Sequence, residues 1–299
     1  MALDPRKTEA LLAILDTGSL EAAAERLKLT PSAISQRLKA LEADLGSPLV
    51  LRTRPCQATR EGRKLVQYLR RRDLLDAEFT RDYHQHEGHE LSISIAMNND
   101  TLATWLLPAL ADFVQSRQLL LNLILDDQDH THALMEAGQT LACVSSQAQA
   151  MRGCVAEPLG MMRYRLLASP AYQQRWFPEG MTREAARRAP VLVFDRKDRL
   201  QANFLARYFG LSDASYPCHY FPATDPFLSA IRLGYGYGMV PEQQFGDALC
   251  SGQLVDLAPD KPTDVALYWH RWKTQSPILE QLSSCLIEAA RQTLRQPDS

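Results

Sequence analysis

A short N-terminal stretch concentrates side chains that can form hydrogen bonds with bases and phosphates. Thr30 precedes Pro31, and the following turns carry the donors and acceptors Ser32, Ser35, Gln36 and Arg37. Two further guanidinium groups, Arg52 and Arg54, stand in a basic segment downstream. Such groups bind base edges and phosphate oxygens, which makes recognition of a nucleic acid the chemistry predicted for this stretch.

A second set of polar side chains stands where strands are expected to end. After the first 90 residues, extended apolar runs alternate with helical segments, which predicts a parallel sheet. In such sheets, ligands bind beyond the carboxyl ends of the strands. The set is strongly acidic and comprises Asn98, Asn99, Asp100, Thr101, Asp126, Asp127, Val144, Ser145, Asp195, Thr224 and Asp225. Carboxylates suit the cationic groups of lysine or arginine, whose own carboxylate needs hydroxyls or backbone N–H groups. Structural alternatives are N-caps at Asp100 and Asp225, a solvated turn at Asp126 and Asp127, and a strand-end hydrogen bond at Ser145.

Two predicted helices position the N-terminal set. Ser19 is a good N-cap residue, and no helix breaker follows before the polar link at Lys28. Thr30 can cap a second helix, in which apolar residues recur at helical spacing until Gly46: Ile34, Leu38, Leu41 and Leu45. A first helix from Pro5 to Thr17 packs beneath this pair. Because a basic segment between two extended runs follows, the pattern predicts a winged helix-turn-helix whose second helix enters the DNA major groove.

The charge of the chain is divided unevenly. Residues 5–72 hold 14 Lys or Arg and 7 Asp or Glu, a net charge of +7. The whole chain has a net charge of −2, so the remainder, with 19 basic and 28 acidic residues, carries −9. A basic module on an acidic body is expected where the first binds nucleic acid and the second does not.

A long helix is predicted from Arg60 to about His84, because the segment contains no proline and no glycine after Gly62. Its apolar residues form one seam: Leu65, Val66, Leu69, Leu74, Leu75 and Phe79. We expect the seam to pack against a second copy of the helix; the alternative is packing on the C-terminal part of its own chain. His84, His86 and His89 then indicate a solvated hinge or, alternatively, a metal site, although their spacing matches no tetrahedral signature.

The helix-turn-helix residues resemble those of the LysR-type transcriptional regulators. The resemblance rests on Gly18-Ser19-Leu20 with Ala22-Ala23-Ala24, on Leu27 through Gln36, and on Leu41-Glu42-Ala43-Asp44-Leu45-Gly46 with Leu49 and Arg52. Val50 replaces the usual Phe, and Ala58-Thr59 the usual Leu-Thr. Segments 96–108, 177–178 and 267–271 are similar to the regulators of lysine and arginine export, and this resemblance covers the whole chain. Contacts of the family's Gly-x-Leu-Asp pattern are not transferred, because this chain has Gly138-Gln139-Thr140-Leu141.

The resemblance implies an α+β multidomain fold. Residues 1–59 would form the winged helix-turn-helix, 60–90 a dimerising linker helix and hinge, and 91–299 an effector-binding domain of two α/β subdomains, like a periplasmic binding protein. Subdomain I would comprise about 91–161 and 267–299, and subdomain II about 162–266. The implied partners are a double-stranded DNA operator, RNA polymerase and further copies of the chain in a homodimer or homotetramer. The effector would be lysine or arginine, acting on genes such as a basic amino acid exporter.

Other classes of function find little support. The chain has no Gly-x-Ser-x-Gly elbow, Walker sequence or His-Glu-x-x-His motif, so no enzyme activity, metal or cofactor is expected. Six scattered cysteines, no targeting segment and no apolar run near 20 residues favour the cytoplasm and argue against a membrane protein. The alternative function is an α/β small-molecule-binding or catalytic protein whose basic head contacts proteins. Steep salt dependence of DNA binding would distinguish the regulator from this alternative.

Overall fold

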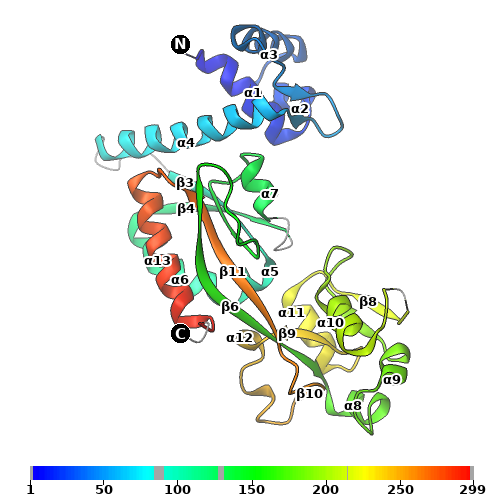
Figure 1. Ribbon diagram of the computed structural model, residues 1–299. Coiled ribbons are helices and arrows are strands. Elements are labelled where there is room, and N and C mark those ends of the chain that lie inside the picture. The colour runs from blue at the N-terminus through cyan, green and yellow to red at the C-terminus, as the bar shows by residue number, and fades with distance from the viewer. Residues whose placement is uncertain (1–2, 84–90, 127–130, 214, 297–299) are drawn as a thin grey trace.

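The computed structural model describes residues 3–83, 91–126, 131–213 and 215–296. An N-terminal head, one long helix and a larger C-terminal domain follow one another along the chain (Figure 1). The head consists of α1 (Pro5–Thr17), α2 (Leu20–Leu27), α3 (Pro31–Leu45) and the two wing strands β1 (Val50–Leu51) and β2 (Gln57–Ala58). The long helix is α4 (Arg60–Tyr83), which lies across the C-terminal domain in Figure 1.

The caps expected from the sequence delimit the helix-turn-helix. The Ser19 hydroxyl accepts a hydrogen bond from the backbone N–H of Ala22 at 3.0 Å, and the Thr30 hydroxyl accepts one from Ala33 at 3.2 Å. Gly46 ends α3 in the left-handed conformation, with φ of 70°. The apolar faces of the three helices meet in a separate buried cluster, which includes residues such as Leu11, Ile14, Ile34, Leu38 and Leu41. The winged helix-turn-helix predicted from the sequence is therefore present.

Helix α4 does not present the single seam predicted from its sequence. Val66 and Leu69 belong to the core of the head, whereas Leu74 belongs to the core of the C-terminal domain. Leu75 and Phe79 are exposed. With about 100° of rotation per residue, these two lie on the opposite side of the helix from Val66 and Leu69. The prediction of one seam is wrong because successive turns of the helix contact different partners.

The contact between α4 and the C-terminal domain of its own chain is specific. The Gln67 side chain donates to the backbone oxygen of Glu136 at 2.6 Å, and the Arg71 guanidinium lies 4.2 Å from the ring centre of Trp272. Gly138 has φ of +74°, and a Cβ there would lie 2.8 Å from a methyl group of Val66. A larger residue would prevent this close approach. The packing mode that was the alternative in the sequence analysis is therefore present along one face of α4.

A seven-stranded mixed sheet forms the centre of the C-terminal domain. Its strand order is β10-β6-β11-β5-β3-β4, and β9 also pairs with β6. The strands are β3 (Leu91–Met97), β4 (Leu119–Leu125), β5 (Ala142–Ser145), β6 (Cys154–Ala168), β9 (Gly238–Pro241), β10 (Val255–Asp256) and β11 (Thr263–Trp272). β3 pairs parallel with β4 and β5, as the alternating pattern predicted, whereas the other pairings are antiparallel. β6 contains Pro158 and pairs with β11 through a β-bulge beside it.

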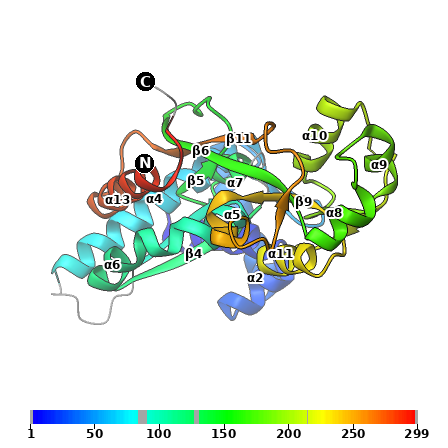
Figure 2. The ribbon, with the colours of Figure 1, turned by 90° about the horizontal axis from the view of Figure 1, so that it is seen from below.

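The long strands β6 and β11 connect two lobes (Figure 1). The first lobe contains β3–β5 with α5 (Asn99–Thr101), a π-helical turn (Leu102–Leu106), α6 (Leu107–Arg117), α7 (Thr131–Glu136) and α13 (Pro277–Thr293). The second contains the parallel pair β7 (Val191–Val193) and β8 (Cys218–Tyr220) with α8 (Pro170–Trp176), α9 (Arg183–Arg188), α10 (Leu200–Phe209), α11 (Thr224–Arg232), α12 (Glu242–Phe245) and a 3₁₀ turn (Gly246–Ala248). Figure 2 shows α8, α9 and α10 on the opposite side of β6 from α6 and α13. No helix among the described residues is long and apolar enough to cross a membrane.

A buried histidine in the first lobe makes the domain sensitive to acid. His270 on β11 is fully buried, its Nε2 lies 2.7 Å from the Gln147 carbonyl oxygen, and the His132 ring packs edge-on at 5.0 Å. Burial lowers the pKa of His270 below its ordinary 6.5; the Gln147 hydrogen bond opposes this shift, and His132 adds to it. The unfolded chain therefore binds this proton more readily, so the stabilising effect is complete above about pH 6.5 and is lost as the pH falls towards the folded pKa.

We expect the unfolding midpoint of the C-terminal domain to fall between pH 7.5 and pH 5.5, as measured by calorimetry. His270→Gln retains a donor for the Gln147 carbonyl but cannot titrate, so its midpoint should fall less over the same range. An equal fall in both proteins would show that other groups determine the acid response.

Candidate functional site

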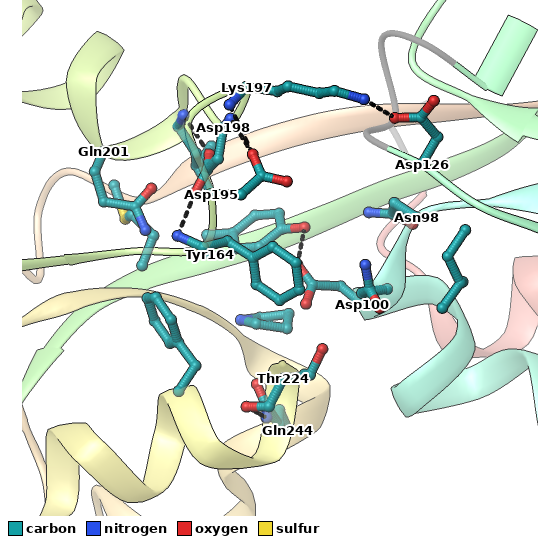
Figure 3. Close-up of a pocket in the computed structure, with 17 residues that line it drawn as sticks. Asn98, Asp100, Asp126, Tyr164, Asp195, Lys197, Asp198, Gln201, Thr224 and Gln244 are labelled. Atoms are coloured by element: carbon teal, nitrogen blue, oxygen red, sulfur yellow. Dashed lines mark hydrogen bonds and ion pairs between the residues drawn. The ribbon is translucent and has the colours of Figure 1, made fainter. Parts of the chain in front are cut away.

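A cavity of about 220 Å³ lies between the two lobes. Six residues of the predicted ligand set line it: Asn98, Asn99, Asp100, Asp126, Asp195 and Thr224. They follow strands β3, β4 and β7 or begin helix α11, so each stands at a strand or helix end that opens between the lobes. Figure 3 shows their side chains around one space, with Asp126 towards one end and Thr224 towards the other. The rule that ligands bind beyond the carboxyl ends of parallel strands therefore leads to this cavity.

Other residues of the predicted set do not line the cavity. Thr101 and Ser145 are completely buried, and Val144 is nearly so; its carbonyl accepts a hydrogen bond from the Thr131 hydroxyl at 2.7 Å. Strand β5 is parallel to β3, so its carboxyl end lies at the same edge of the sheet, but its last residues are buried. Asp225 is exposed in the first turn of α11. Asp127 lies outside the described residues, as do His84, His86 and His89.

Several lining residues were missed by the sequence analysis: Tyr164, Lys197, Asp198, Gln201, Phe227 and Gln244. Lys197 and Asp198 belong to the same strand-end loop as Asp195, so extending the strand-end rule by three residues finds them. Tyr164 lies in the middle of β6, and no local signal marks it. Its hydroxyl donates to the Asp100 carboxylate at 2.8 Å and so links β6 to the start of α5 (Figure 3).

The loop after β7 is held by its own carboxylates. Asp195 accepts hydrogen bonds from the backbone N–H groups of Lys197 at 2.7 Å and Asp198 at 3.0 Å. Asp198 accepts bonds from the N–H groups of Phe194 at 3.2 Å and Leu200 at 2.8 Å, which caps the start of α10. These two carboxylates thus shape the wall of the second lobe. The carboxylates contributed by the first lobe are Asp100 and Asp126.

A second candidate surface lies on helix α3. Ser32, Ser35 and Gln36 share one face of the helix, and Lys39 joins them at helical spacing. Lys39 is exposed and was missed by the sequence analysis. Arg37 projects about 100° from Gln36, and its guanidinium approaches Glu9 of α1 at 4.0 Å. Arg37 therefore lies beside the predicted reading face rather than on it.

The remaining predicted nucleic-acid contacts are exposed. Thr30 caps α3, and Arg52 and Arg54 lie in the loop between the two wing strands. The backbone N–H of Cys56 donates to the Gly18 oxygen at 2.7 Å, which fixes the wing against the end of α1. The arrangement presents a helix and a basic loop together, as binding to a groove and its phosphates requires.

No group of three or more His, Cys, Asp or Glu side chains in the described part of the chain could hold a metal ion. All six cysteines are free thiols, and burial raises the pKa of Cys154 to about 11 and raises that of Cys143 further. Neither of these two thiols is an activated nucleophile at neutral pH.

Comparison with known proteins assigns both domains to one family. Residues 5–63 match the family described as bacterial regulatory helix-turn-helix protein, lysR family, and residues 86–291 match the LysR substrate binding domain. The HTH-type transcriptional regulator ArgP of Aeromonas salmonicida is 39% identical over 295 residues, which cover 98% of this chain and 99% of the relative.

Two solved structures are similar over their full length. The crystal structure of ArgP from Mycobacterium tuberculosis has a TM-score of 0.84 and 37% identity, covering 99% of this chain and 100% of the other. Full-length LysG from Corynebacterium glutamicum, with bound effector Arg, has a TM-score of 0.78 and 34% identity, covering 98% and 100%. These relatives are regulators and not enzymes. The chain therefore belongs to the LysR family, as a DNA-binding transcriptional regulator with an effector-binding domain.

Proposed function

We propose that this regulator responds to a basic amino acid, L-arginine or L-lysine, bound in the cavity between the lobes. The observation that carries the proposal is the pair of carboxylates, Asp100 and Asp126, which the first lobe presents to the cavity. Two carboxylates match the two cationic groups of such a ligand. The arginine bound to LysG of Corynebacterium glutamicum, a protein 34% identical to this chain, supports the same class of effector.

The carboxylate of the effector has a complementary position in the second lobe. Helix α11 begins at Thr224, which lines the cavity, and its N-cap residue, Ala223, makes no side-chain cap hydrogen bond. Unpaired N–H groups at a helix N-terminus attract anions, and the Thr224 hydroxyl adds a donor. Figure 3 places Thr224 and Gln244 towards the opposite end of the cavity from Asp126. A ligand with a carboxylate at one end and a cation at the other would thus contact both lobes.

The working form is a homodimer or a homotetramer, whose heads bind paired half-sites on operator DNA. Helix α4 carries an exposed apolar stripe of Tyr68, Leu75, Phe79 and Tyr83, whose spacings of seven and four residues place them on one face of the helix. Exposed contiguous apolar surface of this kind favours association with another copy. Two heads held together in this way would contact half-sites about one helical turn of DNA, or a multiple of it, apart.

Effector binding would act on the DNA through the lobes and α4. Closure of the lobes around a ligand is a hinge motion. The ligand shifts the protein towards the DNA-bound state that binds the ligand more tightly, by an amount set by the difference in affinity between the states. Helix α4 would transmit the change because Gln67 and Arg71 attach it to the first lobe. In the cytoplasm, this regulator would act with RNA polymerase to control genes such as one for a basic amino acid exporter.

Calorimetric titration of the full-length chain with L-arginine and L-lysine tests the proposal. Saturable binding of at least one is expected, while L-glutamate and L-leucine should give no heat of binding. Asp100→Asn removes a charge from the cavity and should weaken binding roughly 10- to 100-fold, since hydrogen bonds to charged groups contribute about 1.5–3 kcal/mol.

Asp260→Asn is the matched control, because this exposed carboxylate lies outside both the cavity and helix α11. Its affinity should equal that of the wild type. Equal weakening by both substitutions would indicate a general effect of charge, and absence of binding by the folded wild type would refute the assigned effector class.

A further inference from the structure

One cationic side chain of the protein itself already contacts the predicted cation site. Lys197, from the loop after β7 in the second lobe, places its Nζ atom 2.8 Å from Oδ1 of Asp126, at the end of β4 in the first lobe. Both residues line the cavity. Figure 3 shows the Lys197 side chain extending across the upper side of the cavity to Asp126.

The position of Lys197 is fixed at its backbone as well as at its tip. Its N–H group donates to Asp195 at 2.7 Å, and the neighbouring Asp198 caps the start of α10. The loop therefore has a defined conformation from which the side chain reaches over to the other lobe. The contact joins elements separated by 71 residues along the chain.

We propose that Lys197 is a built-in competitor of the cationic effector: its ammonium group holds Asp126 and draws the two lobes together, and the effector must displace it to bind. This inference rests on the proposed function and adds a residue that sets affinity and specificity at that site. An effector can replace the ammonium of Lys197 only if its own cation reaches Asp126 while its carboxylate remains at the other end of the cavity. Amino acids without a long cationic side chain cannot do so.

The ion pair is well suited to be displaced. The Lys197 side chain keeps 55% of its surface exposed, and that of Asp126 keeps 23%. Ion pairs that are open to water contribute little to stability and are screened by salt. The contact can therefore bias the ligand-free protein towards a closed arrangement without preventing the entry of the effector.

Titration of full-length variants with L-arginine tests the competition. Lys197→Met retains much of the length of the side chain without its charge, and it should bind L-arginine about two- to fivefold more tightly than the wild type, given the small contribution of an exposed pair. Lys197→Arg should remain close to the wild type, because it keeps a cation. Lys273→Met, at an exposed lysine that does not line the cavity, should also be unchanged.

A second pair of variants ties the effect to Asp126. In the Asp126→Asn background, Lys197→Met should not tighten binding further, because the group for which effector and lysine compete is gone. A gain of the same size in both backgrounds would overturn the competition.

Agmatine, which is arginine without its carboxylate, distinguishes competition from the opposite role, in which Lys197 holds the effector carboxylate. Competition predicts that Lys197→Met tightens the binding of agmatine and L-arginine alike. Weaker binding of L-arginine by Lys197→Met, with agmatine unaffected, would assign Lys197 to the carboxylate and overturn the inference, as would unchanged affinity for both. Failure of the wild type and of Lys197→Met alike to bind either compound would instead refute the proposed effector class, and the inference with it.

Discussion

Phe79→Asp is expected to convert the protein into a monomer and to lower its affinity for operator DNA by roughly 100-fold or more, because a linked pair of heads gains about that much from the second contact. Phe79 is 70% exposed, lies on the apolar stripe of α4 and stacks on Tyr83. A carboxylate there would be desolvated in any interface between two copies of the helix. Because the side chain is outside both cores, the chain should still fold.

Sedimentation velocity and DNA binding at one fixed salt concentration measure the two effects. Tyr235→Asp is the matched control, since Tyr235 is also an exposed aromatic residue but lies in the second lobe, away from α4. It should leave both association and DNA affinity unchanged. A Phe79→Asp protein that remains dimeric would show that the apolar stripe of α4 is not the interface.

Gln36→Ala should lower operator affinity roughly 10- to 100-fold and relax sequence preference at one position of each half-site, since a good base contact contributes about 1–3 kcal/mol. Gln36 is exposed on the face of α3 that also carries Ser32 and Lys39. Arg37→Ala should have a smaller effect, because its guanidinium is turned towards Glu9. Fluorescence anisotropy with operator and with unrelated DNA measures both changes.

The salt dependence of the same titrations separates the two kinds of contact. Replacement of Arg52, which we predict to bind a phosphate, should reduce the slope of log affinity against log salt by about 1, whereas Gln36→Ala should leave the slope unchanged. A larger loss with Arg37→Ala than with Gln36→Ala would place the reading face on the other side of α3.

The features of this chain that the sequence predicts well are those fixed by local chemistry. Ser19, Thr30 and Gly46 delimit the helix-turn-helix because capping depends on residues within one turn. The carboxyl ends of β3, β4 and β7 could be found because an extended apolar run followed by polar residues is also a local signal. The cavity residues that follow these strands were therefore within reach of the sequence.

The features that the sequence did not predict depend on contacts between distant segments. Val144 and Ser145 end a strand parallel to β3, yet both are buried and do not line the cavity, and no local pattern encodes that burial. Tyr164 reaches the cavity only because β6 spans both lobes. In α4, the sequence shows which residues are apolar. It does not show that some of them pack in the head, some pack on the first lobe and others remain exposed.

The division of α4 also limits how such regulators can be recombined into chimeric sensors. The helix contributes Val66 and Leu69 to the head and Leu74 to the C-terminal domain, and Gly138 of the latter accommodates Val66. A head transplanted together with its own helix would therefore bring a foreign surface onto the recipient domain. Successful fusions should replace the first turns of α4 with the head while retaining the recipient's residues at the positions of Gln67, Arg71 and Leu74, and the residue at position 66 must fit both the head core and Gly138.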